Sequence, residues 1–278
     1  MSGIDRYAVF GNPIKQSKSP VIHQAFADQC GHQLRYRAVL VPVDGFAQAA
    51  RRFFDEGGAG LNVTVPFKLD AFRFADRLTD CAQRAGAVNT LSRKEDDLID
   101  GDNTDGIGLV RDMIVNLGWT VQGQRVLILG AGGATRGVLE PLLKEGPREL
   151  LIVNRTAVKA QQLATDFEDN PGVEGGAYSL IGAREFDLVI NATSAGLTGE
   201  MPELPGSVLT ERSCCYDMVY GAEPTAFMRW AAHHAAWAVA DGLGMLVEQA
   251  AQSFYLWRKV RPDTGPVIKK LRESMTAA

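Results

Sequence analysis

Short apolar runs alternate along the chain with longer segments whose apolar residues recur at helical spacing. The clearest alternation lies at Leu61–Val65, where Asn62 and Thr64 face away from their three apolar neighbours, as in a half-buried strand. Further strands are predicted in the first hundred residues at Tyr7–Gly11, Leu34–Val41, Ala87–Leu91 and Asp97–Ile99.

Helices are predicted between these strands. Ser19 and Pro20 are typical of a helix start, with Ser19 as the N-cap and Pro20 in the first turn. Phe46–Glu56 carries apolar residues at helical spacing and ends at two glycines, and another helix is expected after Pro66.

The rest of the chain repeats this alternation with shorter, fully apolar strands. These are predicted at Arg125–Leu129, Glu149–Val153, Phe186–Asn191 and Cys214–Val219. Thr104–Leu117 reads as a connecting helix stopped by Gly118, and a final helix is expected from about Gly244 to Lys259. Strands separated by helical stretches indicate an α/β fold with parallel, doubly wound pairing.

Composition narrows the possible functions. The chain has 278 residues, a formal net charge of −4 and 46% hydrophobic residues, which favours two modest globular domains. A mildly acidic balance gives no reason to expect nucleic acid or an anionic membrane as a partner. No apolar run approaches the roughly 18 residues of a membrane helix, and no signal peptide pattern is visible, so a cytoplasmic location is the default expectation.

The cysteines and histidines show no metal-binding spacing, so no metal is expected. The cysteines are interpreted as reduced core thiols: Cys30, Cys81, Cys214 and Cys215.

A glycine-rich turn directly after a predicted strand indicates a nucleotide site. Gly130–Ala134 joins the strand to a helix, although Thr135 stands where the third glycine of a dinucleotide fingerprint would be. The second strand of this unit ends without the acidic residue that binds the ribose of NAD, and Arg155 and Lys159 follow instead. Two cations suit a 2′-phosphate and hence NADP. A packing turn and a solvated helix start are the alternatives.

Nine segments, in order, resemble the shikimate dehydrogenase family along essentially the whole chain. They are Gly11-Asn12-Pro13-Ile14 with Ser17-Lys18-Ser19-Pro20 and His23; Asn62-Val63-Thr64-Val65-Pro66-Phe67-Lys68; Gly86-Ala87-Val88-Asn89-Thr90; Asn103-Thr104-Asp105-Gly106; Gly130–Ala134; Asn154-Arg155-Thr156; Asn191-Ala192-Thr193-Ser194; Tyr216-Asp217-Met218-Val219-Tyr220; and Gly242-Leu243-Gly244-Met245-Leu246 with Gln249.

The resemblance implies two α/β domains around a cleft. Residues 1–104 and 240–278 would form a discontinuous substrate-binding and catalytic domain, and residues 105–239 an inserted Rossmann-like NADP-binding domain. Lys68 and Asp105 would carry the proton chemistry. Further shikimate contacts are implied at Ser17, Ser19, Asn62, Thr64, Asn89, Tyr220 and Gln249. Cofactor contacts are expected at Gly130, Ala131, Gly132, Gly133, Ala134, Asn154, Arg155, Thr156, Lys159, Thr193, Met218, Gly242 and Met245.

These side chains also suit the chemistry when taken singly. A helix start attracts a substrate carboxylate near Ser17 and Ser19, and the amides of Asn89 and Gln249 can both donate to and accept from hydroxyls. Each has a plainer alternative, such as an N-cap, a turn residue or a solvated helix position. Without the resemblance, Lys68 would be interpreted as an exposed lysine of a first helical turn.

The implied activity is the reversible NADPH-dependent reduction of 3-dehydroshikimate to shikimate in chorismate and aromatic amino acid biosynthesis, by a monomer or homodimer. One alternative is a quinate/shikimate dehydrogenase using NAD, which Arg155 and the serine pair disfavour. A folate dehydrogenase would lack that serine pair. A catalytically silent NADP-binding regulator on the same fold would be expected to have lost Lys68 or Asp105, and both are present.

Overall fold

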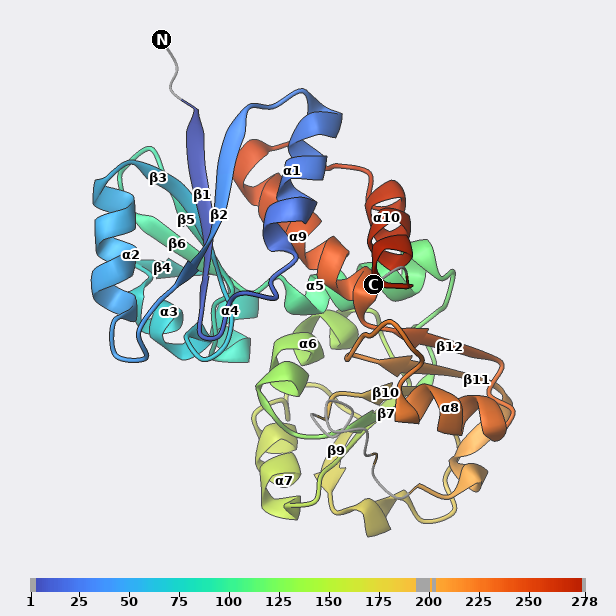
Figure 1. Ribbon diagram of the computed structural model, residues 1–278. Helices are drawn as coiled ribbons and strands as arrows, with labels where there is room; N and C mark the ends of the chain where they lie inside the picture. Colours follow the sequence, from blue (N-terminus) through green and yellow to red (C-terminus); the bar gives the residue numbers. More distant parts are fainter. Residues whose placement is uncertain (1–3, 194–200, 202–203, 277–278) are drawn as a thin grey trace. The chain divides into compact units, whose positions relative to one another are not determined.

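The chain divides into two compact α/β units. The computed structural model describes residues 4–193, 201 and 204–276 (Figure 1). The first unit comprises Met1–Gly108 and Val247–Ile268, and the second comprises Leu109–Leu246 and Lys269–Ala278. Ser194, the last residue of the Asn191-Ala192-Thr193-Ser194 segment, lies outside the described residues.

The first unit is built on a mixed sheet of six strands. Their order is β2 (Leu34–Leu40), β1 (Asp5–Gly11), β3 (Gly58–Val63), β5 (Thr90–Arg93), β6 (Ile99–Asp102) and β4 (Arg77–Leu78). The strands β2, β1 and β3 are parallel, whereas β5 runs antiparallel to both of its neighbours. The helices are α1 (Ser19–Cys30), α2 (Phe46–Asp55), α3 (Lys68–Phe74), α4 (Asp80–Ala85) and most of α9 (Leu243–Arg258).

The alternation of β1 residues explains how both faces of this sheet are covered. Phe10 points to the α2 face, where its ring lies 5.8 Å from that of Phe53. Tyr7 points to the opposite face and stacks on Trp257 of α9 at 4.6 Å between ring centroids. Figure 1 shows α2 on one side of the sheet and α1 and α9 on the other. Successive side chains of a strand point to opposite faces, so both layers of the core follow from the sequence of one strand.

The second unit is a fully parallel, doubly wound sheet. Its order is β12 (Ala238–Asp241), β11 (Leu209–Asp217), β10 (Phe186–Asn191), β7 (Arg125–Leu129), β8 (Glu149–Val153) and β9 (Val173–Gly176). The helical elements are the end of α5 (Asp105–Arg111), a π-helical turn (Asp112–Asn116), α6 (Gly133–Lys144), α7 (Ala157–Thr165), two 3₁₀ turns (Tyr178–Ile181 and Gly206–Val208), α8 (Ala226–His233) and the end of α10 (Gly265–Thr276). Val126 and Ile128 pack with α6 and α7, while Leu127 and Leu129 pack with α8.

Several local predictions were wrong. Helix α1 begins at Ser19 itself, with Lys18 in the N-cap position. The hydroxyl of Ser17 accepts the hydrogen bond from the Ser19 N–H at 3.3 Å, so the residue two positions earlier does the capping. Pro20 is compatible with the second helical position as well as the first, which is why the sequence did not determine the register.

The strand around Asn62 is also shorter at its end than predicted. It ends at Val63, and Val65, expected to face the core, is 60% exposed. The turn into α3 begins at Thr64, whose carbonyl accepts from the Phe67 N–H at 3.0 Å, and Pro66 has no N–H with which to continue the ladder. The helix expected over Thr104–Leu117 divides into α5 and a π-helical turn, and α10 beyond the predicted final helix was not foreseen.

Within the described residues, no helix is long and apolar enough to cross a membrane. In the same part of the chain, no three or more His, Cys, Asp or Glu side chains are grouped so that they could hold a metal ion. All four cysteines are free thiols, and burial raises the pKa of Cys214 to about 11 and that of Cys215 to about 12.

Candidate active site and cofactor surface

Lys68 and Asp105 meet at the starts of two short helices of the first unit. Lys68 is the first residue of α3 and Asp105 the first of α5, and the Lys68 ammonium donates to Oδ2 of Asp105. The other carboxylate oxygen, Oδ1, accepts a hydrogen bond of 2.8 Å from the Asn89 amide. The Lys68 side chain is 32% exposed and that of Asp105 only 16%. A carboxylate held at both oxygens fixes the direction in which the ammonium points.

Asn89 is held rigidly by the segment that leads into α5. Its Oδ1 accepts hydrogen bonds from the Thr104 N–H at 3.0 Å and the Thr104 hydroxyl at 3.1 Å. A third bond, of 2.9 Å, comes from the hydroxyl of Thr90. An oxygen that receives three donors leaves the amide no freedom to flip. The Asn89 NH₂ group therefore has to face Asp105.

Asn62 lies at the centre of a second set of hydrogen bonds in the same unit. Its Oδ1 accepts from the Tyr36 hydroxyl at 2.7 Å, and its Nδ2 lies 3.0 Å from the Ser253 hydroxyl. Nδ2 also reaches Thr90 at 3.1 Å, so the two sets share that residue. Ser253 is a residue of α9, so its contacts with Asn62 and Thr90 tie that helix to the centre of the sheet, and its own hydroxyl donates to the Gln249 backbone carbonyl one turn earlier at 3.1 Å.

The remaining substrate residues expected in the first unit border this network. Burial raises the pKa of Tyr36 well above its ordinary value, and the nearby Ser19 side chain opposes that shift. Thr64 lies against Gly11, where a Cβ atom would come within 2.5 Å of the Thr64 methyl group. Ser17 and Ser19 are both half-buried. Tyr220, in contrast, belongs to the second unit, and burial raises its pKa.

Sequence reasoning missed two members of this network, Tyr36 and Ser253. Tyr36 stands on edge strand β2 between two exposed arginines, and Ser253 is fully buried on α9. For Tyr36, the only signal in the sequence was an aromatic residue with a hydroxyl between two charged residues. Such a residue does not by itself indicate a hydrogen-bond partner.

The glycine turn of the second unit is open to an anion. Gly130 has a φ of 102°, which favours glycine, and the Thr135 hydroxyl donates to the Gly130 carbonyl at 2.8 Å. That bond explains why a threonine replaces the third glycine. A Cβ atom at Gly132 or Gly133 would meet nothing within 4 Å outside the backbone of its own helix, and no side chain caps the start of α6. The first N–H groups of this helix suit a pyrophosphate.

A pocket of about 490 Å³ lies beside this turn. Its lining residues, all in the second unit, are Ala131, Gly132, Gly133, Arg136, Val158, Lys159, Gln162 and Leu163. Arg155, Thr156 and Lys159 are exposed, and Asn154 donates to the Thr156 carbonyl at 3.0 Å. Arg155 is near Tyr178, whose pKa is raised by burial and lowered by the arginine charge. The cations and open N–H groups fit a phosphorylated dinucleotide.

The other expected cofactor residues gather at the carboxyl ends of β10, β11 and β12. Thr193 donates to Asn191 at 2.7 Å, and the Met218 N–H donates to the Asn191 carbonyl at 2.9 Å. Gly242 is essential to the packing, because a Cβ there would lie 2.2 Å from the Met218 carbonyl oxygen. The Met245 N–H donates to the Tyr216 hydroxyl at 3.3 Å.

Comparison with known proteins supports the resemblance to the shikimate dehydrogenase family from one end of the chain to the other. Models of the shikimate dehydrogenase substrate binding domain, of shikimate / quinate 5-dehydrogenase and of the shikimate 5′-dehydrogenase C-terminal domain match residues 9–91, 113–198 and 242–272. The chain is 57% identical to the shikimate dehydrogenase (NADP(+)) of Cellvibrio japonicus over 271 residues, 98% of each chain.

Solved structures agree as well. An Ael1 enzyme from Pseudomonas putida is 46% identical with a TM-score of 0.92, over 96% of this chain and 98% of that one. The shikimate 5-dehydrogenase of Thermus thermophilus, in complex with NADP(H) and shikimate, is 32% identical with a TM-score of 0.86, over 98% and 100%. The resemblance predicted from nine short segments is confirmed, and the chain belongs to the shikimate dehydrogenase family.

Proposed function

We propose that Lys68 and Asp105 form the proton-handling pair of an NADP-dependent shikimate dehydrogenase. The enzyme interconverts 3-dehydroshikimate and shikimate, an oxidoreduction of a CH–OH group within aromatic amino acid biosynthesis. The observation that carries the role of the pair is the doubly held carboxylate of Asp105, which aims the Lys68 ammonium. In this proposal the first unit is the substrate-binding and catalytic domain and the second unit the NADP-binding domain.

Lys68 supplies the proton at the substrate oxygen. NADPH, when bound, provides the hydride that reduces the carbonyl carbon. As negative charge develops on the carbonyl oxygen, the ammonium stabilises it and transfers a proton, and in the oxidation direction the amine accepts the proton back. With 32% of its side chain exposed, Lys68 can exchange that proton with water. Asp105 holds the ammonium in place and offers the substrate hydroxyl an acceptor.

The polar residues around the pair orient the substrate. Ser17 and Ser19 at the start of α1 receive the carboxylate, because hydroxyls and helix N–H groups both favour an anion there. Asn62 uses one lone pair of Oδ1 for Tyr36 and keeps the other for a substrate hydroxyl. Thr64, Asn89, Tyr220 and Gln249 are proposed as the remaining hydroxyl partners.

The cofactor lies on the second unit in this proposal. The glycine turn from Gly130 to Ala134 receives the pyrophosphate, and Asn154, Arg155, Thr156 and Lys159 receive the 2′-phosphate. Thr193, Met218, Gly242 and Met245 contact the nicotinamide half. We infer in addition that the enzyme works in the cytoplasm as a monomer or homodimer, without nucleic acid or membrane as a partner.

An assay with two substrates and two cofactors tests this function. Purified chain is mixed with shikimate or quinate and with NADP⁺ or NAD⁺, and absorbance of the reduced nicotinamide is followed. We expect shikimate with NADP⁺ to give the highest kcat/KM. A preference for quinate with NAD⁺ would favour the alternative quinate/shikimate dehydrogenase, and absence of turnover with tight NADP⁺ binding would favour a silent regulator.

A further inference from the structure

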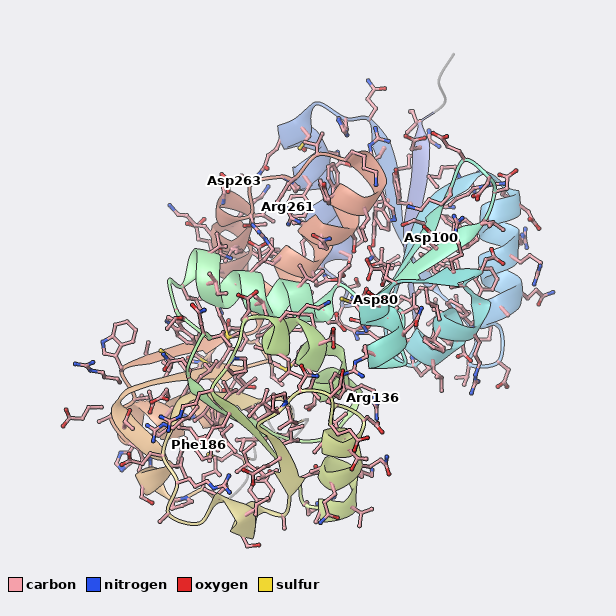
Figure 2. All side chains as sticks on the ribbon, turned by 180° about the vertical axis from the view of Figure 1, so that it is seen from behind. Asp80, Asp100, Arg136, Phe186, Arg261 and Asp263 are labelled. Atoms are coloured by element: carbon pink, nitrogen blue, oxygen red, sulfur yellow. The ribbon has the colours of Figure 1, made fainter. Side chains whose placement is uncertain are left out.

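Arg136 projects from the first turn of α6 into the pocket beside the glycine turn. It lines that pocket together with Lys159 and Gln162 of α7 (Figure 2 labels Arg136). No carboxylate is among the described residues that line this pocket. The pocket therefore offers two cations, one fork-shaped and one a point charge, beside the N–H groups of the turn.

The guanidinium of Arg136 is held in place from the far end of α7. It forms an ion pair with Asp166, and Asp166 Oδ1 accepts a hydrogen bond of 2.9 Å from Gln162. Asp166 is the C-cap residue of α7, where the partial negative charge of the helix end disfavours a carboxylate. An arginine opposite offsets that penalty, and the Arg136 side chain, 33% exposed, has Asp166 as its partner.

We propose that Arg136 is a further specificity-determining residue that contacts the 2′-phosphate of NADP alongside Lys159. This inference rests on the proposed function of the second unit. The open N–H groups of the turn bind the pyrophosphate in this proposal. The cationic pocket that extends over Val158 and Lys159 of α7 is therefore available to the 2′-phosphate. A phosphate monoester carries up to two negative charges and three acceptor oxygens, which match a guanidinium fork plus an ammonium.

The plainer explanation is an ion pair that only joins α6 to α7. The two explanations predict different results. A purely structural pair, once broken, lowers stability and affects all nucleotides alike. A phosphate ligand, once removed, weakens only nucleotides that carry the 2′-phosphate.

The test compares four probes by titration calorimetry: NADP⁺, NAD⁺, adenosine 2′,5′-bisphosphate and AMP. Loss of a charge-assisted hydrogen bond at a partly exposed site corresponds to about a 10-fold effect. We expect Arg136→Gln to weaken NADP⁺ and adenosine 2′,5′-bisphosphate by about 10-fold and to leave NAD⁺ and AMP within about twofold. Arg136→Lys, which keeps the charge without the fork, should lie between the parent and Arg136→Gln.

The matched control is Arg184→Gln. Arg184 also pairs with a carboxylate of the second unit, Glu174, at 2.9 Å, and its side chain is 36% exposed. This variant should bind all four probes like the parent. A parent that prefers NADP⁺ while Arg136→Gln retains the same preference overturns the assignment of Arg136 alone. A parent that binds NADP⁺ no tighter than NAD⁺ overturns the proposed NADP site together with this inference.

Discussion

The proposed substrate-binding unit and the proposed cofactor-binding unit of this enzyme are organised in opposite ways. In the first unit, Lys68, Asp105, Asn89 and Asn62 are hydrogen-bonded to one another or to buried neighbours. In the second unit, Arg155 and Lys159 are exposed and the glycine turn has open space around it. The first arrangement holds its polar groups in a fixed geometry, whereas the second exposes its charged groups to water.

The difference has an energetic consequence. Removing one member of a connected network leaves its partners unsatisfied, so effects of single changes overlap and do not add. Removing an exposed cation leaves no buried group without its hydrogen-bond partner, so the change in ligand affinity reports the lost ligand contact alone. Substitutions should therefore be non-additive on the substrate side and specific for one ligand group on the cofactor side.

The largest expected effect is at the proton-handling pair. Lys68→Ala should lower kcat by about 10² to 10⁴ with little change in NADPH affinity, because a positioned general acid contributes that much. Asp105→Asn should be comparably damaging, since it breaks the contact that aims the ammonium. Steady-state kinetics and NADPH titration measure both quantities.

The double variant tests whether the two residues act as one unit. Lys68→Ala with Asp105→Asn should lose far less activity than the product of the two single losses. If Lys68→Ala retains near-parental kcat while a deuteride isotope effect shows that chemistry limits the rate, Lys68 is not the proton donor. Arg77→Gln, which breaks an exposed ion pair of the same unit, serves as the control and should leave kcat unchanged.

The second prediction concerns the exposed side of the comparison. Arg155→Ala should weaken NADP⁺ by about 10- to 100-fold and leave NAD⁺ nearly unchanged, because it removes charge-assisted bonds to the 2′-phosphate. Binding constants for both cofactors, measured with the same protein preparation, check it. Equal losses for the two cofactors would place Arg155 away from the phosphate.

The sequence foretold these two regions unequally. The glycine turn, its flanking strand and the cations after the second strand lie close together in the chain, so local pattern alone predicted the proposed cofactor surface. The pairing of Lys68 with Asp105 spans 37 positions and that of Asn62 with Ser253 spans 191, and only the fold brings them together. The family resemblance supplied the residues of the pair, but not Tyr36, which orients the Asn62 amide.

Local errors also have a physical origin. The antiparallel strand β5 was expected to begin three residues before its actual start at Thr90, because its register depends on β3 and β6 and not on its own short apolar run. The role proposed for Arg136 likewise depends on contacts with α7 that the sequence does not display.

The third prediction concerns a buried histidine next to the hydrogen-bond network around Asn62. The His23 ring stacks on Tyr36 at 4.3 Å and is 1% exposed. Burial lowers its pKa from 6.5 to about 3. Because the unfolded chain takes up the proton near pH 6.5 and the folded chain only near pH 3, stability is full above pH 6.5 and falls as the pH drops between these values.

Urea unfolding at pH 7 and pH 5 measures this contribution. Protonation of His23 in the unfolded chain should lower the free energy of unfolding by about 2 kcal/mol between pH 7 and pH 5. His23→Phe removes the titration while keeping an aromatic ring in the stack, so its loss of stability between the same two values should be smaller by that amount. An unchanged pH dependence in this variant would mean that His23 is already protonated, or solvated, in the folded enzyme.

The smallest expected effect sharpens the contrast at the cofactor surface without changing any charge. In the proposed site Lys159 meets the 2′-phosphate as a point charge, whereas an arginine there would offer a planar fork that binds two oxygens. Lys159→Arg should therefore tighten NADP⁺ by about 2- to 5-fold and leave NAD⁺ unchanged, a gain of the size typical for a solvent-exposed ion pair. Calorimetry with NADP⁺ and NAD⁺ measures the gain. The control for a general effect of arginine is Lys144→Arg, on an exposed lysine of α6 paired with Glu140.

Because the net charge is constant, a tightening confined to NADP⁺ can come only from the geometry of the contact. Weaker NADP⁺ binding in Lys159→Arg would show that the pocket has no room for a second fork beside Arg136, and that the cations of this surface are not independent after all.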